Sequence, residues 1–300
     1  MLRFISFGSG SSGNCYYFGT ATDGLMIDIG VGIRTLKKHC KDYGIQLQSV
    51  KHLLITHDHA DHIKSVGAFS FEYQVPVYAT KAVHKGIDNN YCIARKVADN
   101  MRRYVEVGQS FTVGEFHVRP FAVPHDASEN VGYEIQVEGM TLVIMTDAGS
   151  VTDEMKETIS RANYLIIEAN HDVEMVESGP YPEFLKKRIL SPSGHLSNKE
   201  CGKVIAENMT ENLRHVWLCH LSEENNHPEL AARPLRPSCA AMASCLARIW
   251  NSRCCAVSCQ QEFMSYLYEK RGDCKGCGSA TGSDGGHGCL HRCVCEGHLR

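Results

Sequence analysis

One seven-residue segment, Thr56–His62, constrains this chain more than any other stretch of its sequence. It carries four closely spaced side chains that can bind a metal: His57, His59, Asp61 and His62. The apolar run Leu53–Ile55 just before it is typical of a strand, so the segment lies on the loop that leaves this strand. Residues two apart on such a turn can point at one metal, and the next pair, carried into a helix start, at a second. Neutral imidazole and carboxylate ligands suit zinc, manganese or iron.

The pattern His-x-His-x-Asp-His after a hydrophobic strand resembles the signature of the metallo-β-lactamase superfamily. This resemblance implies an α/β fold, a four-layer αββα sandwich that carries two metals at one edge. Four further motifs are similar to those of the YycJ (WalJ) type, a nuclease branch of the superfamily: Phe7–Asn14, Ile167–Asp172, Ser193–Ser197 and His220–Asn226. The resemblance covers residues 1–231, which we expect to form one catalytic domain.

The remaining metal ligands of the superfamily have candidates here in the right order: His125, Asp147 and His220. By resemblance, one metal is held by His57, His59 and His125. The other is held by Asp61, His62 and His220, and Asp147 bridges the two. Each of the three later candidates follows a segment with the pattern of a strand. Because the strands of a sandwich end together at one edge, this regularity predicts that all seven side chains converge.

His195 is a predicted catalytic residue outside the metal ligands. It resembles the phosphate-contacting histidine of phosphodiesterase branches such as tRNase Z, where a carboxylate from a preceding strand orients the ring. Glu168 is that carboxylate here, and such a pairing raises the imidazole pKa and suits it to protonate a leaving 3′-oxygen. The alternative is a histidine near solvent at the start of a helix. Asp61 completes the predicted catalytic set, whereas His171 and Asp172 have no assigned role.

The resemblance implies a two-metal nuclease. Two divalent ions close together can share a hydroxide that attacks phosphorus, and can clamp the attacking and leaving oxygens of a phosphodiester. The branch further implies 5′-to-3′ removal of nucleotides from double-stranded DNA, so the expected partner is a nucleic acid substrate, DNA. The sequence contains neither a Gly-x-Ser-x-Gly nucleophile elbow nor a matched Cys/His signature that would indicate another nucleophile.

Two other functions remain open. A thioester or ester hydrolase of the glyoxalase II type uses nearly the same ligands, although His195 and Glu168 favour a phosphodiester. A non-catalytic, metal-dependent nucleic-acid-binding protein would keep the fold without turnover, which the intact ligand set disfavours. A redox diiron protein of the superfamily would resemble His-x-Glu-x-Asp-His, whereas the third position here is His59.

The Gly/Ser-rich segment Gly8–Asn14 offers backbone N–H groups and hydroxyls that can hold a phosphate, and a tight turn is an equal interpretation. Family resemblance favours substrate contact, through Ser11, Ser12 and Asn14. By the same resemblance, Asp28 supports the metal-binding loop without binding metal. The partly basic region 81–103 is interpreted as a solvated helical surface, and a nucleic-acid track is the alternative.

Composition limits these functions. The hydrophobic fraction of 43% is typical of a globular protein, and the N-terminus begins with a strand-like segment rather than a signal segment. Acidic side chains outnumber basic ones up to Ala231, so this part has no general basic field for wrapping DNA. Cysteines are sparse there, as in a reduced cytosolic enzyme. We therefore expect a cytoplasmic protein without a membrane partner, of undetermined oligomeric state.

Residues 232–300 differ in character from the rest, because they hold ten of the 15 cysteines together with Gly-rich turns. We expect a disordered or non-native tail, such as a shifted reading frame would produce. The alternative is a small zinc module built on Cys274 and Cys277, although its second half has no single clear pair of ligands. The helix and strand that close related domains are not evident after Asn225–Pro228.

Overall fold

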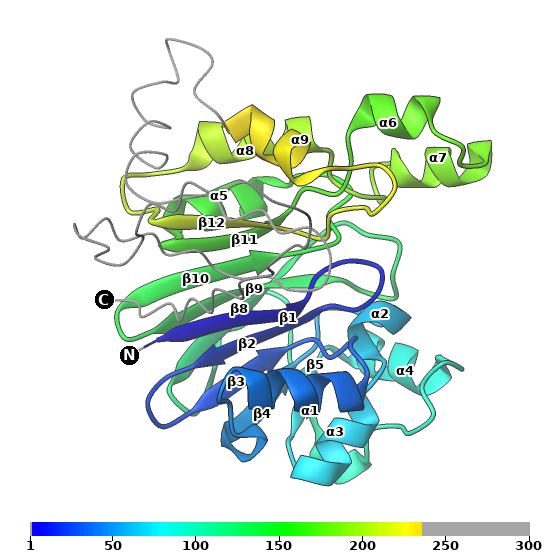
Figure 1. Ribbon diagram of the computed structural model, residues 1–300. Helices are drawn as coiled ribbons and strands as arrows, with labels where there is room; N and C mark the ends of the chain where they lie inside the picture. Colours follow the sequence, from blue (N-terminus) through cyan, green and yellow to red (C-terminus); the bar gives the residue numbers. More distant parts are fainter. Residues whose placement is uncertain (1, 236–300) are drawn as a thin grey trace, which may run out of the picture.

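The computed structural model describes residues 2–235 (Figure 1). Two six-stranded sheets lie face to face in the middle of this part of the chain, and helices cover the outer face of each sheet. The chain completes the first sheet before it begins the second. The predicted four-layer αββα sandwich is therefore confirmed.

The first sheet has the strand order β1-β2-β3-β4-β5-β6. Its strands are β1 (Arg3–Gly8), β2 (Cys15–Gly19), β3 (Gly24–Ile27), β4 (Val50–Leu54), β5 (Val77–Ala79) and β6 (Arg102–Tyr104). The first three pair in antiparallel fashion, and from β3 to β6 the pairing is parallel. The helices in this part are α1 (Ile33–Asp42), α2 (Ala60–Ile63), α3 (Val66–Tyr73) and α4 (Lys81–Asn89), with the short turns η1 (Leu47–Ser49) and η2 (Asp99–Met101).

The second sheet has the order β12-β11-β10-β9-β8-β7. Its strands are β7 (Phe111–Val113), β8 (Phe116–Ala122), β9 (Val131–Val137), β10 (Met140–Met145), β11 (Tyr164–Glu168) and β12 (His215–Cys219). Strands β10, β11 and β12 are parallel, whereas β7 to β10 pair in antiparallel fashion. The helices are α5 (Asp153–Arg161), α6 (Val173–Ser178), α7 (Glu183–Ile189), α8 (Asn198–Asn208) and α9 (Pro228–Ala232), followed by η3 (Arg233–Leu235).

The core consists of three apolar layers. The central layer lies between the sheets, where aromatic rings such as Phe4, Phe116 and Trp217 pack. The outer layers lie between each sheet and its helices. Successive side chains of a strand point to opposite faces, so Leu53 enters an outer layer and Leu54 the central one. Burying each of these leucines contributes about 1.5–3 kcal/mol, which fixes β4 and the loop that follows it.

Several helix limits differ from the sequence prediction. The sequence pattern predicts one helix over residues 63–73, whereas in the structure α2 ends at Ile63 and α3 begins at Val66, because the Ser65 N–H between them donates to Ile29 O instead of continuing a helix. Ser197 followed three residues later by Glu200 predicts a capping box and a helix from Ser197 to Asn212. The capping box is present, with Ser197 and Glu200 bonded in both directions, and the helix ends at Asn208.

The short helix α9 and the turn η3 were not expected from the sequence. Ala232 and Leu235 are buried against the second sheet's helices, and Pro234 lies where a side chain on Gly202 of α8 would stand. The expected domain boundary after residue 231 thus falls inside α9. The predictions for residues 236–300 lie outside the described residues. No helix between residues 2 and 235 is long and apolar enough to cross a bilayer.

Candidate metal centre

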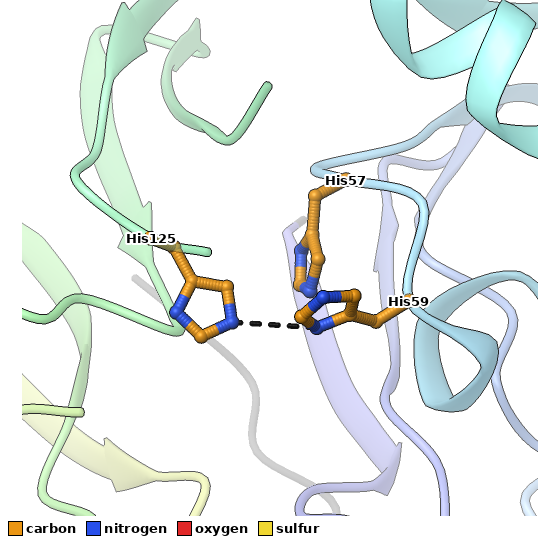
Figure 2. Close-up of side chains that lie close together, drawn as sticks. All are labelled: His57, His59 and His125. Atoms are coloured by element: carbon orange, nitrogen blue, oxygen red, sulfur yellow. Dashed lines mark hydrogen bonds between the residues drawn. The ribbon is translucent and has the colours of Figure 1, made fainter. Parts of the chain in front are cut away.

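The structure brings together all seven side chains that the sequence proposes as metal ligands. The ligand atoms of each of two groups lie within 4.8 Å of one another: His57, His59 and His125, and Asp61, His62 and His220. Figure 2 shows the first group, in which the ring of His125 faces that of His59 and their nearest nitrogens are 3.3 Å apart. Residues 56–62, here called the metal loop, supply four of the seven side chains and later loops supply the other three.

Asp147 lies between the two groups. Its Oδ2 is 3.2 Å from His62 Nε2, and its Oδ1 is 3.5 Å from His220 Nε2 and 3.8 Å from His125 Nε2. The carboxylate is almost completely buried. Asp147 is therefore placed to contact cations on both sides, as a bridging ligand requires.

Each histidine is fixed through one ring nitrogen, which leaves the other nitrogen facing the centre. His62 Nδ1 donates to Asp28 Oδ2 at 2.7 Å, and His220 Nδ1 donates to Glu168 Oε1 at 3.0 Å. His125 Nδ1 donates to the backbone oxygen of Gly194 at 2.9 Å. Such partners set the tautomer and orientation of metal-binding imidazoles.

The same arrangement holds for the other two histidines. His57 Nδ1 donates to Thr56 Oγ1 at 3.0 Å, and His59 Nε2 donates to Asp126 O at 3.3 Å. The Nε2 atoms of His57 and His220 are buried and have no hydrogen-bond partner among the described residues. Buried polar atoms are normally paired, so these nitrogens fit divalent cations.

Left-handed backbone conformations aim three of the residues at this centre. Asp28, Asp147 and His220 have φ angles of 57°, 55° and 53°, and each follows the end of a strand closely. Such a conformation is uncommon outside glycine and clusters at functional sites. In this conformation the Asp28 carboxylate accepts hydrogen bonds from the N–H and the hydroxyl of Thr56, and these bonds hold the start of the metal loop in place.

Charge is unequally distributed between the two groups. Burial disfavours the charged ring of His62, but the carboxylates of Asp147 and Asp28 outweigh it and raise the pKa of His62 to about 10. Burial, by contrast, lowers the pKa of His57 and of His125. The surplus of negative charge around His62 attracts a cation, and protons compete with metal there.

His195 and Glu168 form a pair beside this centre. His195 Nδ1 lies 2.8 Å from Glu168 Oε1, and Glu168 Oε2 accepts hydrogen bonds from the N–H groups of Ala148 and Leu196. Burial opposes ionisation of Glu168, but the charge of His195 lowers the pKa of Glu168 to about 2. Burial also opposes the charge of His195, and the Glu168 carboxylate outweighs it and raises the pKa of His195.

The sequence matches a family model described as a β-lactamase superfamily domain over residues 25–220. The chain belongs to the metallo-β-lactamase superfamily. Over 230 residues, 77% of this chain, it is 36% identical to the exodeoxyribonuclease YycJ of Bacillus anthracis and 34% identical to the exodeoxyribonuclease WalJ of Streptococcus pneumoniae D39. These matches cover 86% and 85% of the two relatives.

A solved structure supports the same fold. The metallo-β-lactamase fold protein YhfI from Bacillus subtilis superimposes with a TM-score of 0.60 at 18% identity, over 78% of this chain and 92% of that one. Membership of this superfamily, in its YycJ/WalJ branch, makes the chain a metal-dependent hydrolase, and the fold implies divalent metal ions.

The residues expected to contact substrate occupy two different environments. Ser11 and Ser12 are exposed, and Ser12 lines a pocket of about 510 Å³ beside α1. Asn14 is completely buried, and its amide nitrogen lies 3.4 Å from Asp61 Oδ2 and 2.9 Å from His62 Nε2. Asn14 therefore holds the Gly/Ser-rich loop against the metal loop.

Two basic side chains of region 81–103 make hydrogen bonds within the fold. Arg102 donates two hydrogen bonds to the carboxylate of Asp88, and Lys96 donates to the backbone oxygens of Ile87 and Asn90. These contacts favour a surface over a nucleic-acid track for region 81–103, in which the predicted helical structure is limited to α4 and the turn η2.

Asp126 is a residue of the centre that the sequence prediction missed. Its backbone oxygen fixes His59, and its carboxylate lies 2.5 Å from Arg188 Nε at the end of α7. The only signal in the sequence is its position directly after His125.

Proposed function

We propose that this protein is a two-metal exonuclease that removes nucleotides from double-stranded DNA in the 5′-to-3′ direction. The observation that carries the proposal is the convergence of seven metal-capable side chains beside the His195–Glu168 pair. The relatives named exodeoxyribonucleases support DNA as the substrate. The direction and the preference for duplex DNA follow from resemblance to the YycJ/WalJ branch.

The seven side chains would serve two metal sites. His57, His59 and His125 would hold one ion, Asp61, His62 and His220 would hold the other, and Asp147 would contact both. The donor set of imidazole and carboxylate suits zinc or manganese, with iron as a further candidate. When bound, two such ions supply a nucleophile at neutral pH and neutralise the charge of a phosphodiester.

His195 is the proposed general acid. Its Nδ1 is bonded to Glu168, so its Nε2–H is the proton available for the leaving 3′-oxygen. Burial opposes the charged ring, but the Glu168 carboxylate outweighs it and raises the pKa of His195, which favours the protonated form of the ring. Burial opposes ionisation of Asp61, but His220 and His62 outweigh it and lower the pKa of Asp61, whose Oδ2 lies 3.5 Å from His220 Nε2. We assign this partly exposed carboxylate to the catalytic set.

Other proposals concern the surroundings of the centre. Exposed Ser11 and Ser12 are candidates to contact the DNA backbone at the edge of the Gly/Ser-rich loop. Asn14 can act only through the metal loop that it contacts. No cysteine between residues 2 and 235 forms a disulfide, which supports a reducing, cytoplasmic location.

The experiment uses one DNA duplex, labelled either at its 5′ or at its 3′ end, with added manganese or zinc. The expected result is stepwise release of nucleotides that begins at 5′ ends, and loss of this activity in Asp147→Ala. His195→Ala should retain metal but slow DNA cleavage by about 10²–10⁴-fold, while His117→Ala, at an exposed site on β8, serves as the control. Release that begins at 3′ ends, or attack on RNA alone, would contradict the proposal.

A further inference from the structure

A second pocket opens beside the candidate centre and has no role in the function proposed so far. It lies between the N-terminal end of α8 and the loop after Asp147, and has a volume of about 540 Å³. Its lining includes Ser150, His171, His195, Lys199 and Lys203. Because His195 also contacts Glu168 at the centre, the pocket and the metal-capable residues share a boundary.

His171, like Ser197, is a buried polar side chain in the lining of this pocket. It is 1% exposed, and its Nδ1 is buried without a hydrogen-bond partner among the described residues. Its backbone oxygen accepts from Asn198 N, which fixes His171 next to the start of α8. The adjacent Asp172 caps α6 by accepting from Met175 N, so it has a structural task. A buried imidazole nitrogen that the fold leaves unpaired is suited to meet a ligand.

The charge of the pocket favours an anion. Lys199 and Lys203 line it. Lys203 Nζ lies 4.0 Å from Glu207 Oε1 in an exposed pair, whereas no carboxylate of the described residues lies within ion-pair distance of Lys199. The carboxylate of Glu200 accepts from the hydroxyl and N–H of Ser197, so it is directed to the cap. Helix α8 has 11 residues, and its N-terminus adds a partial positive charge.

The position of the pocket indicates which anion it receives. In the proposed function, His195 protonates the 3′-oxygen that leaves, so the departing nucleotide lies on the side of His195. The pocket lies on that same side. We propose that it binds the 5′-phosphate of the nucleotide that is released, through Lys199, Lys203 and His171. This inference rests on the proposed function, and it explains how an exonuclease would recognise a phosphorylated 5′ end.

The test compares two duplexes that differ only in a 5′-phosphate or a 5′-hydroxyl at the end to be degraded. For the wild-type protein, kcat/KM should be at least about tenfold higher with the phosphate, the usual worth of one or two phosphate contacts. In the double variant Lys199→Ala, Lys203→Ala this preference should fall close to one. His171→Asn should reduce it severalfold. The control Lys51→Ala, an exposed lysine on β4, should keep the wild-type ratio.

A binding measurement separates this inference from the nuclease proposal. Fluorescence anisotropy of labelled oligonucleotides with either 5′ end, in the presence of chelator, reports the pocket without turnover. Hydrolysis of bis(p-nitrophenyl) phosphate by the wild-type protein reports the metal centre alone, so its absence would count against the nuclease and leave the binding result standing. Equal affinity for both ends in the wild type, or an unchanged preference in the double lysine variant, would overturn the pocket assignment.

Discussion

Glu168 and His195 illustrate how single residues set the chemistry of this centre. The buried carboxylate raises the pKa of the imidazole, and the imidazole lowers the pKa of the carboxylate to about 2. If His195 is the general acid, as proposed, it is active only while protonated, so DNA cleavage should be sustained below the raised pKa of His195 and fall as the pH rises through it. Removal of the carboxylate charge should lower this pKa and move the fall to lower pH.

Glu168→Gln tests this expectation, because the amide oxygen can still accept from Ala148 N and the negative charge is gone. The measurement is kcat against pH with an oligonucleotide. The alkaline limb should shift to lower pH relative to wild type. With bis(p-nitrophenyl) phosphate, whose leaving group needs no proton, the shift should be smaller. An alkaline limb at the wild-type position with DNA would refute the role assigned to this pair.

A second prediction at the residue scale concerns Asp28, which supports the metal loop. It accepts hydrogen bonds from Thr56 and from the Nδ1 of His62, and His62 is the one proposed metal ligand to which its side chain is hydrogen-bonded among the described residues. Asp28→Ala should weaken metal affinity about 10–100-fold, as measured by competition with a coloured chelator. Asp42→Ala, at an exposed site at the end of α1, is the control. Wild-type affinity in Asp28→Ala would show that the metal loop keeps its shape without this support.

The strands of the second sheet position three of the proposed metal ligands, because the loops that carry His125, Asp147 and His220 begin where β8, β10 and β12 end. The pattern of apolar runs followed by His125, Asp147 and His220 was sufficient to predict that these side chains converge, since strands in a sandwich end at common edges. The left-handed backbone of Asp147 and His220 could not be predicted. Neither aspartate nor histidine requires a positive φ angle, so this conformation depends on how the loops pack.

The ends of the helices also divide into those that the sequence predicts and those that depend on contacts with other elements. The capping box of Ser197 and Glu200 is a local signal, and it predicted the start of α8 correctly. The break at Ser65 depends on a hydrogen bond to Ile29 in another element, so no local signal announces it. The disordered or non-native tail expected for residues 232–300, with a zinc module as the alternative, stays a prediction, and residues 236–300 lie outside the described residues.

Gly30 tests how closely the metal loop packs on the first sheet. A Cβ atom at this glycine would lie 1.5 Å from the backbone oxygen of Asp61, whereas at Gly32 the nearest atom would be 4.0 Å away. Gly30→Ala should lower the free energy of unfolding by about 1–3 kcal/mol or more, because the metal loop must move, and metal affinity should fall with it. Urea denaturation and chelator competition provide the two measurements. Equal behaviour of Gly30→Ala and Gly32→Ala would contradict this packing.

At the scale of the whole molecule, the packed domain extends past the boundary expected from the sequence. A chain that ends at Leu235 should fold and bind metal as the full chain does. A chain that ends at residue 231 loses buried Ala232 and Leu235, and should unfold at lower urea concentration, by about 2 kcal/mol or more. Equal stability of the two truncated chains would show that η3 does not contribute to the fold.

Because residues 1–231 carry a net negative charge, positive charge for binding a nucleic acid must come from particular sites. Acidic side chains exceed basic ones up to Ala231, so affinity for DNA cannot come from a general field. The cations proposed for the metal centre and the lysines of the α8 pocket supply positive charge only where phosphates would lie.

The most direct test of the account is an anomalous difference map from crystals of this protein grown with manganese or zinc. Two strong peaks are expected, one among His57, His59 and His125 and one among Asp61, His62 and His220, with Asp147 in contact with both. A map with no peak at these residues, from crystals that contain the metal elsewhere, would contradict it.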